Sequence, residues 1–238
     1  MIDAVTYGII AGLATIFGML LILYKTRWAK RNIIYLMSAA AGFLLGAAFI
    51  QIIPESIKLS ENAILFVLGG FLLFYLIENL VMIHSCTEKY CKKHEIVGAI
   101  SLIGLGLHSL VDGLAIGIGF EVSKVIGIVT ALAVIAHEVP EGMSSMTLAY
   151  YSGMSRAKAV IYSLIVALAT PFGAIMTYLF LSNLSSAAIG MLLGIAAGSF
   201  IYVSAADLIP ETHKRFNIFN VLCLFFGLVA SALISWLI

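Results

Sequence analysis

The sequence has little charge for its length and no long polar stretch. Only 11% of its 238 residues are Asp, Glu, Lys or Arg, while 62% are hydrophobic. A soluble domain carries about 25% charged residues, so the composition excludes an ordinary soluble fold. Because no long polar segment separates the apolar runs, we expect no separate soluble domain and no nucleic-acid partner.

The sequence also lacks the marks of a cleaved leader at its start. The first apolar run begins at Asp3 without a basic n-region and without a small-residue cleavage site. We therefore expect this run to be a retained membrane span and not a signal peptide.

Eight apolar runs follow one another along the chain, each long enough to cross a hydrocarbon core of roughly 30 Å as a helix. They predict an all-α polytopic membrane protein embedded in the lipid bilayer. The expected spans are residues 3–24, 33–53, 63–83, 96–119, 125–149, 157–181, 185–208 and 218–238.

Basic residues are divided unevenly between the two sides of these spans. The net charge of +1 carries no information about partners. Only Lys58 and Lys124 lie on one side, and the other side holds eleven: Lys25, Arg27, Lys30, Arg31, Lys89, Lys92, Lys93, Arg156, Lys158, Lys214 and Arg215. Cytoplasmic connections carry the excess of Lys and Arg. We therefore expect a multi-pass protein of the cell membrane with both termini outside.

The chain has only three cysteines. Cys223 falls in the last span, where it is expected to pack as a small buried hydrophobe. Cys86 and Cys91 fall in a connection assigned to the cytoplasm, which is a reducing compartment, so we expect no structural disulfide there.

Two segments 156 residues apart resemble each other. Residues 41–56 read "AGFLLGAAFIQIIPES" and residues 197–212 read "AGSFIYVSAADLIPET". They close the second and seventh spans, which cross in opposite directions, so they predict an inverted repeat as found in secondary transporters. Chance similarity of two apolar helices is the alternative. We expect one transporter domain over residues 1–238 in a 3+2+3 arrangement, with repeat halves 1–94 and 154–238 around central helices at 95–153.

A second pair of similar motifs lies between these halves. "HSLVDG" begins at His108 and "HEVPEG" begins at His137, and in each motif a carboxylate follows the histidine by four residues. This spacing puts His108 and Asp112 on one helical face, and His137 and Glu141 on another, with Cβ atoms roughly 5–6 Å apart. Opposed faces would bring two imidazoles and two carboxylates together near the membrane midplane.

Such a group of polar side chains needs a partner, since a charge at the bilayer centre costs at least about 2.5–3.5 kcal/mol. No Lys or Arg lies nearby in the sequence, and a dication would balance the carboxylates. Mixed imidazole and carboxylate ligands suit Zn²⁺, Fe²⁺, Mn²⁺, Co²⁺ or Cd²⁺ and not Cu⁺, whereas Ca²⁺ and Mg²⁺ take oxygen ligands. A single intramembrane histidine is equally consistent with a hydrogen-bonded core residue, but the duplicated motif favours a metal site.

Two further features of these spans concern helix packing. Gly113 and Gly117 have the spacing of small residues that lets membrane helices approach closely, and we expect them to draw spans 4 and 5 together. Pro140 removes a helix hydrogen bond and predicts a kink in span 5. An ordinary membrane-helix proline, whose freed carbonyl is satisfied by neighbours, is the alternative.

With these residues in place, the sequence resembles the ZIP (Zrt-/Irt-like) family of divalent metal transporters. The resemblance rests on "HSLVDGLAIG" and "HEVPEG" in adjacent spans, a paired "PE" closing spans 2 and 7, and eight spans with both ends outside. It covers essentially the whole chain. It implies a binuclear metal centre between spans 4 and 5, inverted halves around it, and a homodimer.

The resemblance implies that the main ion is bound by His108, Asp112, His137 and Glu141. A second ion, giving two ions in one centre, would be bridged by Asp112 and Glu141. It would also be touched by Ser109 and Glu138. Two departures weaken the expectation of a second ion: Ser109 stands where many members have Asn, and Thr170 stands where many have Glu before the proline of span 6.

Other polar residues are candidates for a pathway or a loop site. Glu55 is expected near the external mouth, and Asp207, Glu211 and His213 near the cytoplasmic mouth, where helix-end acids in water are the alternative. The connection after span 3 holds possible cytoplasmic ligands, with a solvated polar loop as the alternative: His84, Cys86, Cys91 and His94.

The leading functional prediction is transport of a divalent transition metal, Zn²⁺ foremost, into the cytoplasm by alternating access. Because ligands must be deprotonated to bind metal, affinity is expected to fall towards about pH 5–6, where imidazole becomes charged. An intramembrane zinc hydrolase is the alternative, since "HEVPE" begins like a zinc-protease signature with Glu138 as base. A metal sensor is a third reading, for which no signalling domain is present.

Overall fold

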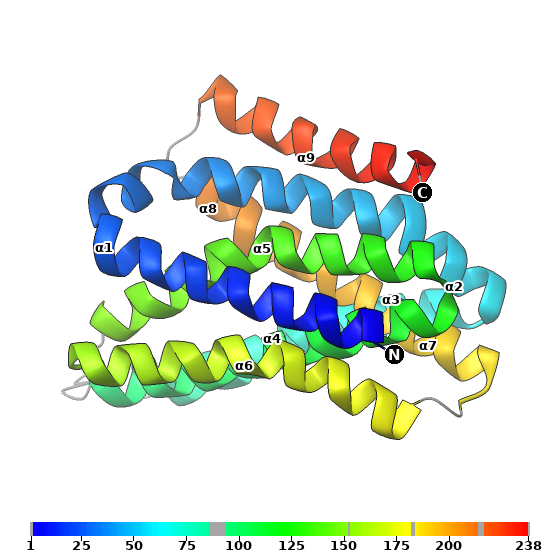
Figure 1. The fold of residues 1–238 in the computed structure, drawn as a ribbon, viewed down its shortest axis with the longest axis horizontal. Helices are drawn as coiled ribbons and strands as arrows, with labels where there is room; N and C mark the ends of the chain where they lie inside the picture. Colours follow the sequence, from blue (N-terminus) through cyan, green and yellow to red (C-terminus); the bar gives the residue numbers. More distant parts are fainter. Residues whose placement is uncertain (1, 86–93, 152, 182–183, 214–216, 238) are drawn as a thin grey trace.

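The computed structural model describes residues 2–85, 94–151, 153–181, 184–213 and 217–237 (Figure 1). Within these ranges all regular structure is helical and no strand is present. The elements in order are α1 (Ile2–Gly46), η1 (Ala47–Ile52), α2 (Ile53–Leu59), α3 (Ala63–Ser85), α4 (His94–Val122), α5 (Lys124–Tyr151), α6 (Arg156–Leu181), α7 (Ser186–Tyr202), η2 (Val203–Leu208), α8 (Ile209–His213) and α9 (Ile218–Leu237).

The length and composition of these helices confirm an all-α membrane protein. Among the described residues, six segments are long and apolar enough to cross a bilayer: Ile2–Lys25, Arg31–Leu59, Leu102–Val122, Lys124–Tyr150, Arg156–Phe180 and Ser186–His213. Two shorter apolar stretches, Ala63–Ile77 and Ile218–Ile234, lie where the remaining two spans are expected. The first span and most of the second lie in α1, which consists of two helices separated by a kink at Lys25, where the dihedral angles are not helical.

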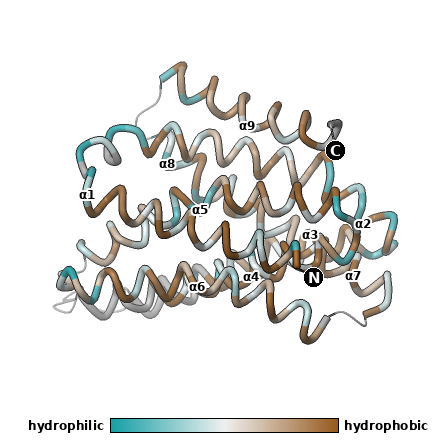
Figure 2. Tube along the Cα trace, in the orientation of Figure 1, coloured by the Kyte–Doolittle hydropathy of each residue, from teal (hydrophilic) through white to brown (hydrophobic). Residues whose placement is uncertain are grey.

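The helices lie side by side along the long axis of the molecule, with the polar residues at its ends. Figure 2 shows hydrophilic residues gathered at the turn within α1 and around α2, at opposite ends. Large apolar side chains cover the outside, and Phe226 is 71% exposed. Because hydrocarbon solvates such side chains and gives no hydrogen bonds to the backbone, this surface suits a bilayer.

Close helix contacts at two glycines position the centre of the bundle. A Cβ on Gly142 of α5 would overlap the carbonyl oxygen of Thr15 in α1, and a Cβ on Gly113 of α4 would overlap that of Thr170 in α6. Gly117 also faces α6, at Thr177. The expectation that Gly113 and Gly117 draw α4 against α5 is therefore wrong, since the neighbour that needs the missing side chain is α6.

Two π-helical turns mark the related segments of the sequence. The π-helix η1 lies within the second span and η2 lies directly after α7, and their residues correspond at the same offset of 156 as the sequence match. Each leads into a short helix with proline at its second position, Pro54 in α2 and Pro210 in α8. Isolated π-helical turns are rare and are common at functional sites. Their matched positions show that the likeness extends to backbone geometry.

Candidate metal centre

Four side chains from α4 and α5 converge in the middle of the bundle. One ligand atom from each lies within 4.8 Å of all the others in the group His108, Asp112, His137 and Glu141. Each helix supplies two members four residues apart, which puts them on one face. α5 continues through Pro140 as one helix, so His137 and Glu141 keep that spacing across the proline.

Asp112 lies between the two imidazoles. Its Oδ2 is 3.2 Å from His108 Nε2 and 3.1 Å from His137 Nε2. The other ring nitrogen of His137, Nδ1, lies 3.0 Å from the carbonyl oxygen of Ala133. A carbonyl only accepts, so Nδ1 donates to it; when Nε2, which faces Asp112 Oδ2, carries no proton, it offers a lone pair to a cation. A lone pair facing a carboxylate oxygen favours a cation between them, and the bond to the backbone carbonyl orients the ring for it.

Two carboxylate oxygens of the group lack a hydrogen-bond partner among the described residues. They are Asp112 Oδ1 and Glu141 Oε2, and both are buried. Burying a charged group without compensation is costly, so these oxygens mark where a cation is needed. The donor set of two nitrogens and two carboxylates fits Zn²⁺ and similar ions.

Each histidine meets a phenylalanine ring on one side. Phe74 of α3 meets His108 edge-on with ring centroids 5.4 Å apart, and Phe200 of α7 meets His137 at 6.3 Å. The imidazoles themselves are 5.6 Å apart. These phenylalanines were not anticipated, because nothing in an apolar span shows which ring faces a distant helix. An apolar shell limits water and lowers the local dielectric around a metal.

Ser109 and Glu138 are buried beside these four residues, and the side chains of both have hydrogen-bond partners. The Ser109 hydroxyl lies 2.5 Å from Glu141 Oε1 and 3.1 Å from the carbonyl oxygen of Leu105. Glu138 accepts hydrogen bonds from Thr170, at 2.7 Å, and from Thr15. Sequence reasoning missed the role of Thr15, which is 123 residues from Glu138.

Three of these four residues, His108, His137 and Glu141, line a cavity of about 580 Å³. Asp207 of η2 and Glu211 of α8 line the same cavity. Two pathway candidates therefore share a cavity with the centre. His213 lies at the end of α8.

The remaining candidates lie apart from the centre. Glu55 in α2 forms an ion pair with Lys58 at 2.7 Å. The predicted loop site falls largely outside the described residues: Cys86 and Cys91 belong to the undescribed segment 86–93, and only the backbones of His84 and His94, in α3 and α4, are described.

Comparison with known proteins identifies the chain's relatives. The family model of the ZIP zinc transporters matches residues 82–235, more than half of the chain. The zinc transporter zipt-7.2 of Caenorhabditis elegans is 32% identical over 135 residues, which are 55% of this chain and 29% of that protein. The zinc transporter zipt-7.1 of Caenorhabditis briggsae is 26% identical, over 74% of this chain and 61% of that protein.

A human relative is similar over a longer part of the chain. The metal cation symporter ZIP14 of Homo sapiens is 24% identical over 80% of this chain and 55% of that protein. The chain thus spans between about a third and three-fifths of the length of these relatives. By the family match over residues 82–235, this chain belongs to the ZIP zinc transporter family.

Proposed function

We propose that this protein carries divalent transition-metal ions, Zn²⁺ foremost, across a membrane. The observation that carries the proposal is the group of two imidazoles and two carboxylates within 4.8 Å on α4 and α5. Three of the four residues are buried, and two of the carboxylate oxygens lack a hydrogen-bond partner in the described chain. The relatives are named as zinc transporters and as a metal cation symporter. Fe²⁺, Mn²⁺, Co²⁺ and Cd²⁺ suit the same donor set.

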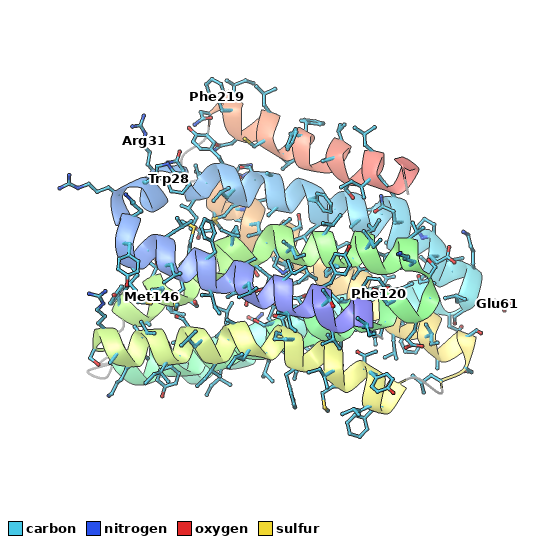
Figure 3. All side chains as sticks on the ribbon, viewed as in Figure 1. Trp28, Arg31, Glu61, Phe120, Met146 and Phe219 are labelled. Atoms are coloured by element: carbon cyan, nitrogen blue, oxygen red, sulfur yellow. The ribbon has the colours of Figure 1, made fainter. Side chains whose placement is uncertain are left out.

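We propose that the chain has eight spans in a 3+2+3 arrangement in the cell membrane. The matched π-helices η1 and η2 support an inverted repeat with halves 1–94 and 154–238 around residues 95–153. The labelled Arg31 lies at one end of the bundle, and Glu61 and the marked chain ends lie towards the other (Figures 1 and 3). With the basic end in the cytoplasm, both termini are outside. The homodimer that the family resemblance implies stays a prediction.

The cavity supports a direction and a conformational state. It is lined by His137 and Glu141 and also by Asp207 and Glu211. Helix α8, which carries Glu211, lies towards the end of the bundle where Arg31 lies (Figures 1 and 3). Buried apolar side chains, among them Leu44, Ile52 and Phe200, form the continuous core cluster that includes the region around η1. We propose that this is a cytoplasm-facing state of an alternating-access cycle. Glu55 would receive the ion outside, and Asp207, Glu211 and His213 would pass it to the cytoplasm.

Purified protein in liposomes provides the test. We expect ⁶⁵Zn²⁺ uptake by the native chain, loss of uptake in His137→Ala, and normal uptake in the matched control Ser163→Ala. Ser163 is buried in α6 and its hydroxyl contacts Met146 sulfur at 3.8 Å, so this control removes a buried polar group from another location. A native protein that binds Zn²⁺ but moves none would refute transport.

A zinc hydrolase built on "HEVPE" is the less favoured function. Its general base would be Glu138, and both oxygens of that carboxylate accept hydrogen bonds from threonines. The relatives described above are named as transporters. A base must reach the proton of a metal-bound water, and these hydrogen bonds hold Glu138 to α1 and α6. Because these relatives are named as transporters, a metal sensor is not favoured either.

A further inference from the structure

Glu138 is held in place by hydroxyl groups from two other helices. Its Oε1 accepts a hydrogen bond from Thr170 of α6 at 2.7 Å, and its Oε2 accepts one from Thr15 of α1. All three residues are completely buried. A buried carboxylate needs donors or a cation, and here both oxygens have a donor.

The two neighbouring carboxylates differ from Glu138 because each has an oxygen without a hydrogen-bond donor. Asp112 Oδ1 and Glu141 Oε2 are buried without a hydrogen-bond partner in the described part of the chain, whereas no oxygen of Glu138 is in that condition. Glu138 also lies outside the group whose ligand atoms are within 4.8 Å. The four ligand atoms within 4.8 Å therefore define one ion position, and Glu138 is not among the residues that form it.

The charges of the ligand residues are consistent with one ion. One dication neutralises the carboxylates of Asp112 and Glu141, while the third buried carboxylate, Glu138, is stabilised by the hydroxyls of Thr15 and Thr170. A second dication would need further anionic ligands, yet α6 offers Thr170 and α4 offers Ser109, whose hydroxyl lies 2.5 Å from Glu141 Oε1. Neutral hydroxyls do not supply the charge that a second buried dication requires.

Resting on the proposed transport function, we propose that this centre holds a single divalent ion and that Glu138 is a positioning residue, fixed by Thr15 and Thr170. Glu138 follows His137 directly and precedes Glu141 by three residues, so tying it to α1 and α6 fixes the rotation of α5 that aims both ligands at the ion. The second ion of the family resemblance does not fit these residues.

Ion counting with X-ray absorption tests the proposal. The number of ions in the centre is the difference in bound Zn²⁺ between the purified native chain and the double variant His108→Ala/His137→Ala, which discounts any other site. We expect a difference of one ion per chain, unchanged in Glu138→Gln. We also expect no Zn–Zn scattering at the roughly 3.5–4 Å typical of two-metal centres.

Hydroxyl variants test the positioning role. Thr170→Val is expected to weaken Zn²⁺ affinity by roughly tenfold, as for groups that orient metal ligands, and Thr170→Ser to restore it. Thr177→Val is the matched control on the same helix, since its hydroxyl lies near the backbone oxygens of Leu114 and Gly173. Equal affinities in Thr170→Val and Thr170→Ser would overturn the positioning role.

The ion count separates the possible failures. Two ions in the native centre would overturn the single-ion centre, and no ion in Glu138→Gln would overturn the positioning role of Glu138; both outcomes leave the proposed transport intact. No difference between the native chain and the double histidine variant would remove the metal site itself, and with it the proposed function.

Discussion

Replacing Gly142 with alanine tests the contact that brings Thr15 to Glu138. A Cβ at Gly142 would lie 2.7 Å from the carbonyl carbon and 3.0 Å from the Cα of Thr15, and would overlap its carbonyl oxygen. Ordinary contacts begin at 3.4 Å, so the carbonyl carbon alone requires a shift of at least about 0.7 Å between α1 and α5. Overpacking of this kind costs about 1–3 kcal/mol.

Gly106→Ala on α4 is the matched control, because a Cβ there meets nothing within 4 Å. Both variants gain the same helix preference of alanine over glycine, so their difference isolates the overlap. For a chain of this size we expect the unfolding temperature of Gly142→Ala in detergent to lie roughly 2–12 °C below that of Gly106→Ala.

The same displacement separates Thr15 from Glu138, so Zn²⁺ flux should fall in Gly142→Ala and persist in Gly106→Ala. Equal unfolding temperatures in the two variants would show that α1 and α5 are not in close contact, and the reasoning from this packing would be refuted.

Three further predictions concern the ion and its path. Asp112→Asn removes the carboxylate that lies between both imidazoles. Zn²⁺ binding should weaken by about 100-fold or more, which exceeds the roughly 10–100-fold typical of groups that only orient ligands. Native affinity measured by calorimetry would contradict this. Zn²⁺ affinity should fall between about pH 7.5 and about pH 5, since protons compete for the imidazoles of His108 and His137, and equal affinity at both values would argue against imidazole ligands. Asp207→Asn should slow ⁶⁵Zn²⁺ release with little change in Zn²⁺ binding, because Asp207 lines the same cavity as His137 and Glu141. Glu121 is exposed and serves as the control. Equally slow release in Glu121→Gln would show that the effect is not specific to Asp207.

Much of the centre could be predicted from local spacing. Residues four apart on a helix share a face whatever surrounds it, so His108 with Asp112 and His137 with Glu141 follow from the sequence once each span is helical. The duplication of the motif predicts that the two pairs face each other. In the structure one ligand atom from each of the four residues lies within 4.8 Å of the others.

The neighbours of Glu138 could not be predicted in this way. Thr15 and Thr170 are 123 and 32 residues from Glu138 in sequence, and threonine is common in membrane helices for other reasons. The helix that packs against Gly113 is α6 and not α5 as the sequence predicts. A small residue indicates that some helix approaches closely, but it does not indicate which helix that is.

By itself, the sequence determined the apolar helices, the two His-carboxylate faces and the sequence repeat at an offset of 156, because these depend on hydrophobicity and on periodicity along a single helix. Only the tertiary structure decided that α1 and α6 place their threonines on Glu138, that Phe74 and Phe200 meet the histidines, and that Asp207 lines the cavity. These relations depend on which helices lie against each other and at what rotation, and close packing of whole helix faces sets that.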